Sequence, residues 1–312
     1  MIYPARRLGF AVLVLWAAYT VSFAVLFLLS DPVATLVARA SDGASVTPAD
    51  LAALKARYGF DQPLVVQYLE RLGAAVRGDL GTSFVSGQPV GATIADALPP
   101  TLQIATAGLV LAVVFGAGVA LVATYTRHRW LAQTLMGLPS LAVSLPVFWV
   151  GLMLVQLFSF QLGWLPAVGA RGPEALILPA VTLALPTGAL IAQVLVKSMS
   201  TALAEPYVTT ARAKGVGPVA VHLRHALGNA AIPALTVLGY VAGNLLAGTV
   251  VVETVFTRPG LGRITVEAVA DQDVPLVQGV VLFAAVVFVV VNLVVDLIYP
   301  LLDPRVTQAV PA

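Results

Sequence analysis

The sequence predicts an all-α, polytopic membrane protein with six transmembrane helices, and two observations lead to this fold class. The first is composition, because 59% of the 312 residues are hydrophobic and only 10% are charged, whereas soluble domains carry about 25% charged residues. With so few charged residues, a soluble fold of this chain would expose a large apolar surface to water. In a bilayer, the same apolar surface faces lipid. The second observation is the presence of six long apolar stretches.

Each of these stretches is long enough to cross about 30 Å of hydrocarbon as a helix. The first, residues 8–29, follows Arg6 and Arg7, and a cleaved signal peptide is the alternative interpretation. The run is longer than a typical signal-peptide core and no A-x-A-like site follows it promptly, so we expect a retained helix. The remaining five stretches are residues 100–125, 131–160, 175–196, 230–252 and 278–299.

The polar segments divide the chain into three predicted regions. Residues 1–30 form the N-terminus and the first helix, and residues 31–98 form a small extracytoplasmic helical lobe with helical periodicity at 48–58 and 63–76. Residues 99–312 form the transmembrane core, which contains a cytoplasmic loop at residues 197–229.

Charge predicts the orientation of the helices. An even number of spans places both termini on one side. That side has only two acidic residues, Glu205 and Asp303, and nine basic ones, which are Arg6, Arg7, Arg127, Arg129, Lys197, Arg212, Lys214, Arg224 and Arg305. The opposite side has eight basic and twelve acidic residues. The positive-inside rule therefore predicts that both termini and the 197–229 loop are cytoplasmic.

The sequence contains no constellation of catalytic residues. Cysteine is absent, no G-x-x-x-x-G-K-[ST] phosphate loop occurs, and no polar pair inside the spans suits an intramembrane enzyme. His128, His222 and His225 lack metal-binding partners, and we interpret them as solvated basic residues. Asp296 is the one clear acid within a span, and we expect it to be a paired acid at a helix end rather than the ion site of a coupled carrier.

The cytoplasmic loop EPYVTTARAKGVGPVAVHLRHALGNAAIP is the most informative segment. Residues 206–214 predict a short helix that ends at Gly215, and a Gly-Pro break separates it from a second amphipathic stretch. Such a basic helical hairpin suits a groove on a soluble partner, although a loop resting on anionic lipid head groups has the same composition.

Four blocks of the sequence resemble the membrane permease subunits of bacterial ABC importers, in the dipeptide, oligopeptide and nickel group. Within this group, the sequence resembles permeases of the dipeptide permease B type. The blocks are LKARYGFDQPLVVQYLERL with RGDLGTSF, YVTTARAKG with LRHALGNAAIP, ETVFTRPGLGR with VEAVADQDVPLVQG, and NLVVDLIYPLLDPRV. The resemblance implies the type I ABC importer permease fold.

The resemblance also implies an ATPase-coupling site in the cytoplasmic loop. Thr209, Thr210, Ala211 and Gly215 occupy the family's Glu-Ala-Ala-x-x-x-Gly frame, and threonine replaces the glutamate, which puts a salt bridge from that position in doubt. The helix in this frame is the family's coupling helix. The coupling residues that we expect are Tyr207, Thr209, Thr210, Ala211, Arg212, Ala213, Lys214, Gly215 and Arg224.

A second site follows from the resemblance of the TRPGLGR segment. We expect it to form an extracytoplasmic gate or a contact with a binding protein through Arg258, Pro259, Gly260, Gly262 and Arg263. For its glycines, ordinary turn chemistry and a gating role are equally good explanations.

The resemblance implies a non-catalytic permease subunit that forms half of the translocation path for short peptides. Its expected partners are a second homologous permease subunit, two nucleotide-binding ATPase domains that use ATP and Mg²⁺, an extracytoplasmic solute-binding protein and the lipid bilayer. No cofactor or metal is expected in this chain, and its net charge of +2 gives no reason to expect nucleic acid. The expected location is the bacterial plasma membrane. Nickel or haem-type cargo, a homodimeric permease and an ion-coupled secondary carrier are the alternatives.

Overall fold

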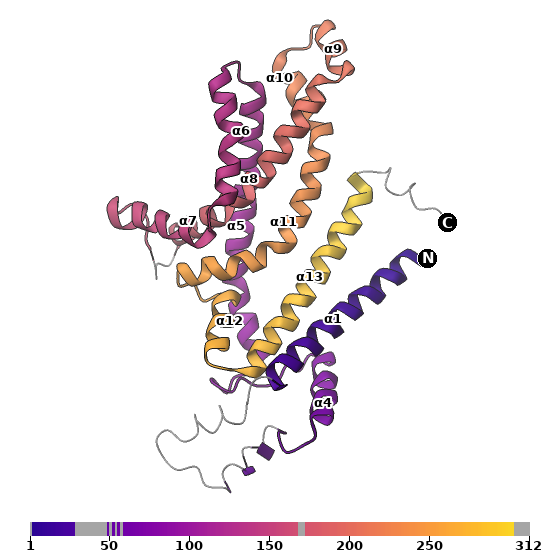
Figure 1. The fold of residues 1–312 in the computed structure, drawn as a ribbon, viewed down its shortest axis with the longest axis vertical. Coiled ribbons are helices and arrows are strands. Elements are labelled where there is room, and N and C mark those ends of the chain that lie inside the picture. The colour runs from indigo at the N-terminus through magenta and orange to yellow at the C-terminus, as the bar shows by residue number, and fades with distance from the viewer. Residues whose placement is uncertain are drawn as a thin grey trace. The chain divides into compact units, whose positions relative to one another are not determined.

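The computed structural model (Figure 1) describes residues 2–28, 49, 52–53, 55–56, 59–167 and 172–302. Most of the predicted helical stretch at 48–58 lies outside these residues, as does the side chain of Asp296. The chain divides into two compact units, of which the first is Met1–Pro99 with Arg263–Val289 and the second is Pro100–Gly262 with Val290–Ala312. The first unit thus groups the start of the chain with a late segment, whereas the regions expected from the sequence are consecutive.

An aromatic cluster holds the first unit together. On α1 (Ile2–Leu28), Tyr19, Phe23 and Phe27 are buried, and the Phe23 and Phe27 rings stack with centroids 4.3 Å apart. The lobe helix α4 (Leu64–Val76) packs against this cluster. The predicted helix at 63–76 is thus confirmed.

Arg71 of α4 is the charged residue of this cluster. Its guanidinium lies 5.0 Å from the ring centroid of Phe27 and 5.4 Å from that of Phe60. Burial lowers the pKa of Arg71 from its ordinary value, and the faces of the two rings offset part of this desolvation through cation–π attraction.

A buried aspartate in the first unit joins two segments that are distant in sequence. Asp273 precedes α13 (Val274–Leu302) and is 1% exposed. Its carboxylate accepts hydrogen bonds from the hydroxyl of Ser83, from the amide of Phe84 at 3.0 Å and, more weakly, from the amide of Leu276 at 3.4 Å. Asp273 therefore caps the start of α13 and fixes the RGDLGTSF segment at the same point.

The second unit is built around α8 (Glu174–Ala204), which packs against α11 (Leu227–Val255) and α6 (Arg129–Ser144). Glycines allow α8 to approach α5 (Val90–Tyr125) closely. A Cβ added to Gly116 of α5 would lie 2.6 Å from the carbonyl oxygen of Gly188 of α8. Small residues at such a crossing are the usual means by which membrane helices pack, because no water drives them together.

The third predicted stretch, residues 131–160, is helical but sharply bent. The structure has α6 followed by α7 (Val147–Leu154) and its continuation η1 (Val155–Gln161), and the two parts are bent by 105°. The cause is Pro146, because a residue before proline is driven out of the helical region. The preceding Leu145 is extended, with φ −84° and ψ 133°.

The expected multi-pass, all-helical architecture is present in the described part of the chain. Five of its helices are long and apolar enough to cross a membrane, and the bent pair brings the number to six if it counts as one span. The corresponding segments other than the bent pair are Gly9–Phe27, Val90–Tyr125, Glu174–Ala204, Pro218–Gly243 and Val274–Val291.

Candidate functional site

The predicted coupling helix is α9 (Pro206–Ala213), which lies in the connection between α8 and α11. Glu205 before it is extended, with ψ 148°, and Pro206 occupies the first helical position, where its missing N–H costs nothing. Val208 and Ala211 are buried and anchor one face of α9. The other predicted coupling side chains are exposed, and these are Tyr207, Thr209, Thr210, Arg212, Ala213, Lys214 and Arg224.

Gly215 ends α9 in a left-handed conformation, with φ +81°. The amide of Gly215 donates to the carbonyl of Arg212 at 3.0 Å, and the amide of Val216 donates to the carbonyl of Ala211 at 3.1 Å. This pair of bonds is the Schellman motif, which satisfies carbonyls that a helix end leaves without partners. The turn therefore requires glycine for its backbone angle, as the sequence predicted.

We expect Gly215→Ala to destabilise this turn by about 1 kcal/mol, because a left-handed conformation costs an L-residue about that much. Nothing lies within 4 Å of the added methyl group, so the effect is conformational rather than steric. The fold should therefore survive while α9 becomes less ordered. Hydrogen exchange of α9 amides checks this result, with Gly217→Ala as the control because Gly217 has an ordinary φ and an equally open site. Equal exchange in both variants would contradict the argument.

His222 departs from the prediction that the three histidines are solvated. His128 and His225 are exposed, but His222 is only 9% exposed. It lies on η2 (Val221–Ala226), a π-helical turn that follows α10 (Pro218–Ala220). The interpretation of His222 as a solvated basic residue is therefore wrong. A π-helical turn displaces side chains from the positions that α-helical spacing predicts.

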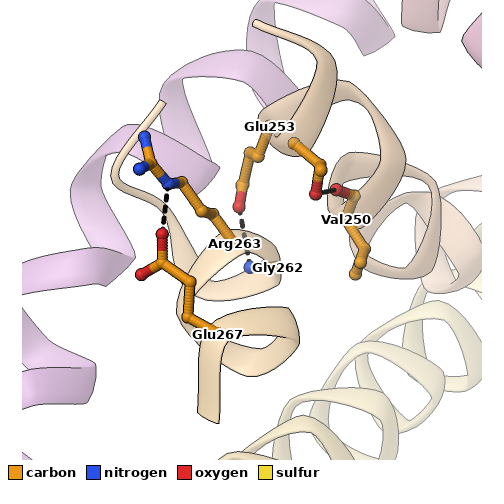
Figure 2. Close-up of polar contacts among 6 residues, drawn as sticks. Val250, Glu253, Gly262, Arg263 and Glu267 are labelled. Atoms are coloured by element: carbon orange, nitrogen blue, oxygen red, sulfur yellow. Dashed lines mark hydrogen bonds and ion pairs between the residues drawn. The ribbon is translucent and has the colours of Figure 1, made fainter. Parts of the chain in front are cut away.

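The second predicted site, the TRPGLGR segment, connects α11 with α12 (Leu261–Ala270) and encloses a buried carboxylate. Figure 2 shows the side chain of Glu253, near the end of α11, directed at the amide of Gly262. Glu253 is 0% exposed. A carboxylate so far removed from water requires hydrogen-bond donors around it.

These donors come from both ends of the segment and from α5. The amide of Gly262 donates to Glu253 Oε2 at 2.7 Å, and the hydroxyl of Thr101 donates to Oε1 at 2.6 Å. The amide of Leu261 in turn donates to the Thr101 hydroxyl at 2.8 Å. Glu253 and Thr101 thus satisfy the first amides of α12, where a negative charge is also favoured by the helix dipole.

The two glycines of the segment leave room for this carboxylate. A Cβ on Gly260 would lie 2.3 Å from Cδ of Glu253, and a Cβ on Gly262 would lie 2.3 Å from Cα of Val250. Both distances are far below any van der Waals contact. Gly260 and Gly262 therefore form a tight turn that closes around the buried carboxylate of Glu253.

The remaining predicted residues of this segment differ in their surroundings. Arg258 is half-buried and donates to the carbonyl of Ala175 at 3.2 Å and to Gln103 Oε1 at 3.4 Å. Pro259 is exposed. Arg263 forms an ion pair with Glu267 at 2.6 Å (Figure 2).

Glu253 and Thr101 were not predicted from the sequence. In the sequence, Glu253 directly follows the fifth apolar stretch, and Thr101 lies at the start of the second. The available signal was an isolated acid at the end of an apolar stretch, seven residues before a glycine. Nothing in the sequence indicates its partner 152 residues earlier.

The fold is similar to that of a solved ABC transporter. The crystal structure of an amino acid ABC transporter with histidines matches with a TM-score of 0.51, covering 69% of this chain and 94% of that chain at 17% identity. This likeness shows a shared fold, in which helices long enough to cross a membrane pack together.

The chain belongs to the family described as the binding-protein-dependent transport system inner membrane component, whose model matches residues 108–308. A second family model, which describes the N-terminal part of membrane components of binding-protein-dependent transport systems, matches residues 1–105. Among relatives, the glutathione transport system permease protein GsiC of Salmonella choleraesuis (strain SC-B67) is 40% identical over 301 residues, 96% of this chain and 97% of that protein. GsiC of Escherichia coli (strain K12) is 38% identical over 304 residues, 97% of this chain and 98% of that protein.

These matches confirm the identification made from the four sequence blocks. The chain is a non-catalytic, multi-pass inner membrane subunit of an ABC importer, and it is a permease of the peptide type.

Proposed function

We propose that this chain forms half of a translocation path for short peptides and that α9 couples the path to ATP hydrolysis in a partner. The partners are a second homologous permease subunit, two nucleotide-binding ATPase domains and an extracytoplasmic solute-binding protein. ATP and Mg²⁺ act on the ATPase domains, and both termini and α9 face the cytoplasm. The sequence relationship to permease subunits supports this assembly.

The observation that carries the coupling role is the construction of α9. Val208 and Ala211 fix the helix on its own chain, while the polar and basic side chains of the opposite face remain exposed. The Asn229 amide also donates to the Tyr207 hydroxyl at 3.1 Å, which ties α9 to the start of α11. A short helix held in this way suits a groove on a soluble protein, and it is placed to pass movement to α11.

We propose a short peptide of the size of glutathione as the cargo. The relatives with 38–40% identity are named for glutathione transport, and nickel chelates and haem are the alternatives. With the purified importer in liposomes, ATPase activity stimulated by the binding protein should rise with glutathione or another short peptide. A rise with only a nickel chelate or haem would reject the peptide assignment and leave the importer class intact.

The coupling role is tested by reversing the charge of α9. We expect Arg212→Glu combined with Lys214→Glu to weaken co-purification of the ATPase and to reduce stimulated hydrolysis at least about tenfold, because charge-assisted contacts with a partner would become repulsive. Both side chains are exposed, so the fold should be preserved.

The matched control is Arg127→Glu combined with Arg129→Glu, which reverses two exposed charges, one on the connection between α5 and α6 and one at the first residue of α6. The control should leave ATPase binding close to that of the unmodified chain. Equal binding by the α9 variant and the control would reject α9 as the coupling helix.

For the second site, we propose that the exposed Pro259 and the adjoining Arg258 and Arg263 contact the binding protein, while Gly260 and Gly262 shape the turn. Support comes from the burial of the glycines and from the exposure of Pro259. Pro259→Ala combined with Arg263→Ala should weaken binding-protein stimulation without changing basal hydrolysis.

A further inference from the structure

His222 lies between two backbone carbonyl groups. Its Nδ1 is 3.1 Å from the carbonyl oxygen of Pro218, and its Nε2 is 3.2 Å from the carbonyl oxygen of Thr124. Carbonyl oxygens can only accept hydrogen bonds. A neutral imidazole carries one N–H and satisfies only one of the two, whereas an imidazolium donates to both.

The contact with Thr124 connects different elements. Pro218 begins α10, directly after the hairpin turn, whereas Thr124 lies in the last turn of α5. The carbonyls of a last helical turn lack partners within the helix, and a cation there is favoured by the helix dipole. His222 therefore caps α5 from the segment that follows α9.

The surroundings of His222 are mostly apolar. The ring of Tyr125 meets the imidazole edge-on, with centroids 5.2 Å apart. Around His222, a surface hollow is lined by Leu121, Val122, Tyr125, Val219 and Leu223. The two carbonyl contacts are thus made with little competition from water, which strengthens them.

The charged and titratable side chains on the elements around His222 are mainly cationic. At the end of α5, in the last two turns of α8, in α9 with its two capping residues, and in η2, they are Tyr125, Lys197, Glu205, Tyr207, Arg212, Lys214, Arg224 and His225, of which Glu205 is the one acid. The arginines, like His225, are exposed, so their repulsion of a second cation is reduced by water and salt. The carbonyl pair, in direct contact, offers an acceptor to each of the two N–H groups of an imidazolium.

We propose that His222 is a positioning residue whose imidazolium form clamps the α9–α10 hairpin to the end of α5. With the clamp closed, movement of α9 is passed to α5 as well as to α11. With the imidazole neutral, one of the two contacts is lost and the hairpin moves more independently of α5. The inference rests on the proposed coupling role of α9.

The functional experiment compares the unmodified importer with His222→Gln between pH 5.5 and 8.5, the range in which histidines generally titrate. The readout is the ratio of binding-protein-stimulated to basal ATPase activity, so that the pH dependence of hydrolysis itself cancels. For the unmodified chain, we expect this ratio to fall about fivefold from pH 6 to pH 8. The reason is that a neutral His222 no longer places a cation at the C-terminal end of α5, where the helix dipole favours one. His222→Gln should give a low ratio that does not vary with pH.

The matched control is His225→Gln, which changes an exposed histidine on the same turn. It should follow the pH profile of the unmodified chain. If His222→Gln also keeps that profile, the clamp does not exist.

A structural experiment separates this inference from the proposed function. The chain has no cysteine, so spin labels can be attached through Thr209→Cys on α9 and Arg127→Cys beside the end of α5. The distance distribution should be narrower at pH 6 than at pH 8, and equally broad at both pH values with His222→Gln. No pH effect on the distances would overturn the clamp even in an active importer. A pH effect in a chain whose partners give no stimulation would support the clamp and reject the coupling role.

Discussion

Replacement of Glu253 by alanine is expected to lower the stability of this permease by about 3 kcal/mol, because buried donors that lose their acceptor cost about 1–3 kcal/mol each. The amide of Gly262 and the hydroxyl of Thr101 both donate to this carboxylate. Alanine also leaves a void beside Gly260, whose α-carbon faces the Glu253 carboxyl group. The start of α12 should then detach from the end of α11.

Thermal unfolding of the purified chain in detergent checks this expectation. Glu253→Gln is the informative companion, because the amide keeps the shape of the side chain and one acceptor oxygen. It should lose about half as much stability as alanine. If alanine and glutamine variants unfold at the temperature of the unmodified protein, the carboxylate does not organise the turn.

Replacement of Gly262 by alanine is expected to cost about 2–3 kcal/mol, the upper part of the range for an overpacked core. The added Cβ would lie 2.3 Å from Cα of Val250 and 3.0 Å from Oε2 of Glu253. The first of these atoms belongs to the backbone of α11 and cannot move aside as a side-chain tip can. The turn must therefore open, and the bond between the Gly262 amide and Glu253 must lengthen.

The control for this variant is Gly118→Ala, which adds the same methyl group to α5 at a position where nothing lies within 4 Å. Because alanine is the better helix former, the control should be neutral or slightly stabilising. Unfolding temperatures and binding-protein-stimulated ATPase should separate the two variants. Similar values for both would show that the close contact at Gly262 relaxes at little cost.

The features that the sequence predicted well are local ones. Apolar length predicted the membrane helices, and the Gly215 position predicted the end of α9, because a left-handed helix end strongly selects glycine. The bounds of α9 differ from the predicted helix by a single residue at its end. Each of these features depends on a short stretch of chain and on water or lipid, not on a distant partner.

The features that the sequence did not predict depend on other parts of the fold. One apolar stretch contains both Pro139 and Pro146, yet Pro139 lies inside α6, whereas Pro146 directly precedes α7 at the break between the two helices. A proline pattern does not distinguish a kink from a bend of 105°. The partners of Glu253 and His222 lie 152 and 98 residues away, and a single sequence holds no measure of such proximity.

The first unit has a consequence for how the protein is made. Its aromatic cluster and its Asp273 junction use residues from Met1–Pro99 and from Arg263–Val289, so the ribosome supplies the two parts far apart in time. During synthesis, α1 in the membrane and α4 in the lobe therefore lack the α13 part of their packing until nearly the whole chain has been made. Factors that shield this half-built surface during translation should therefore matter more to the yield of this protein than its final stability does.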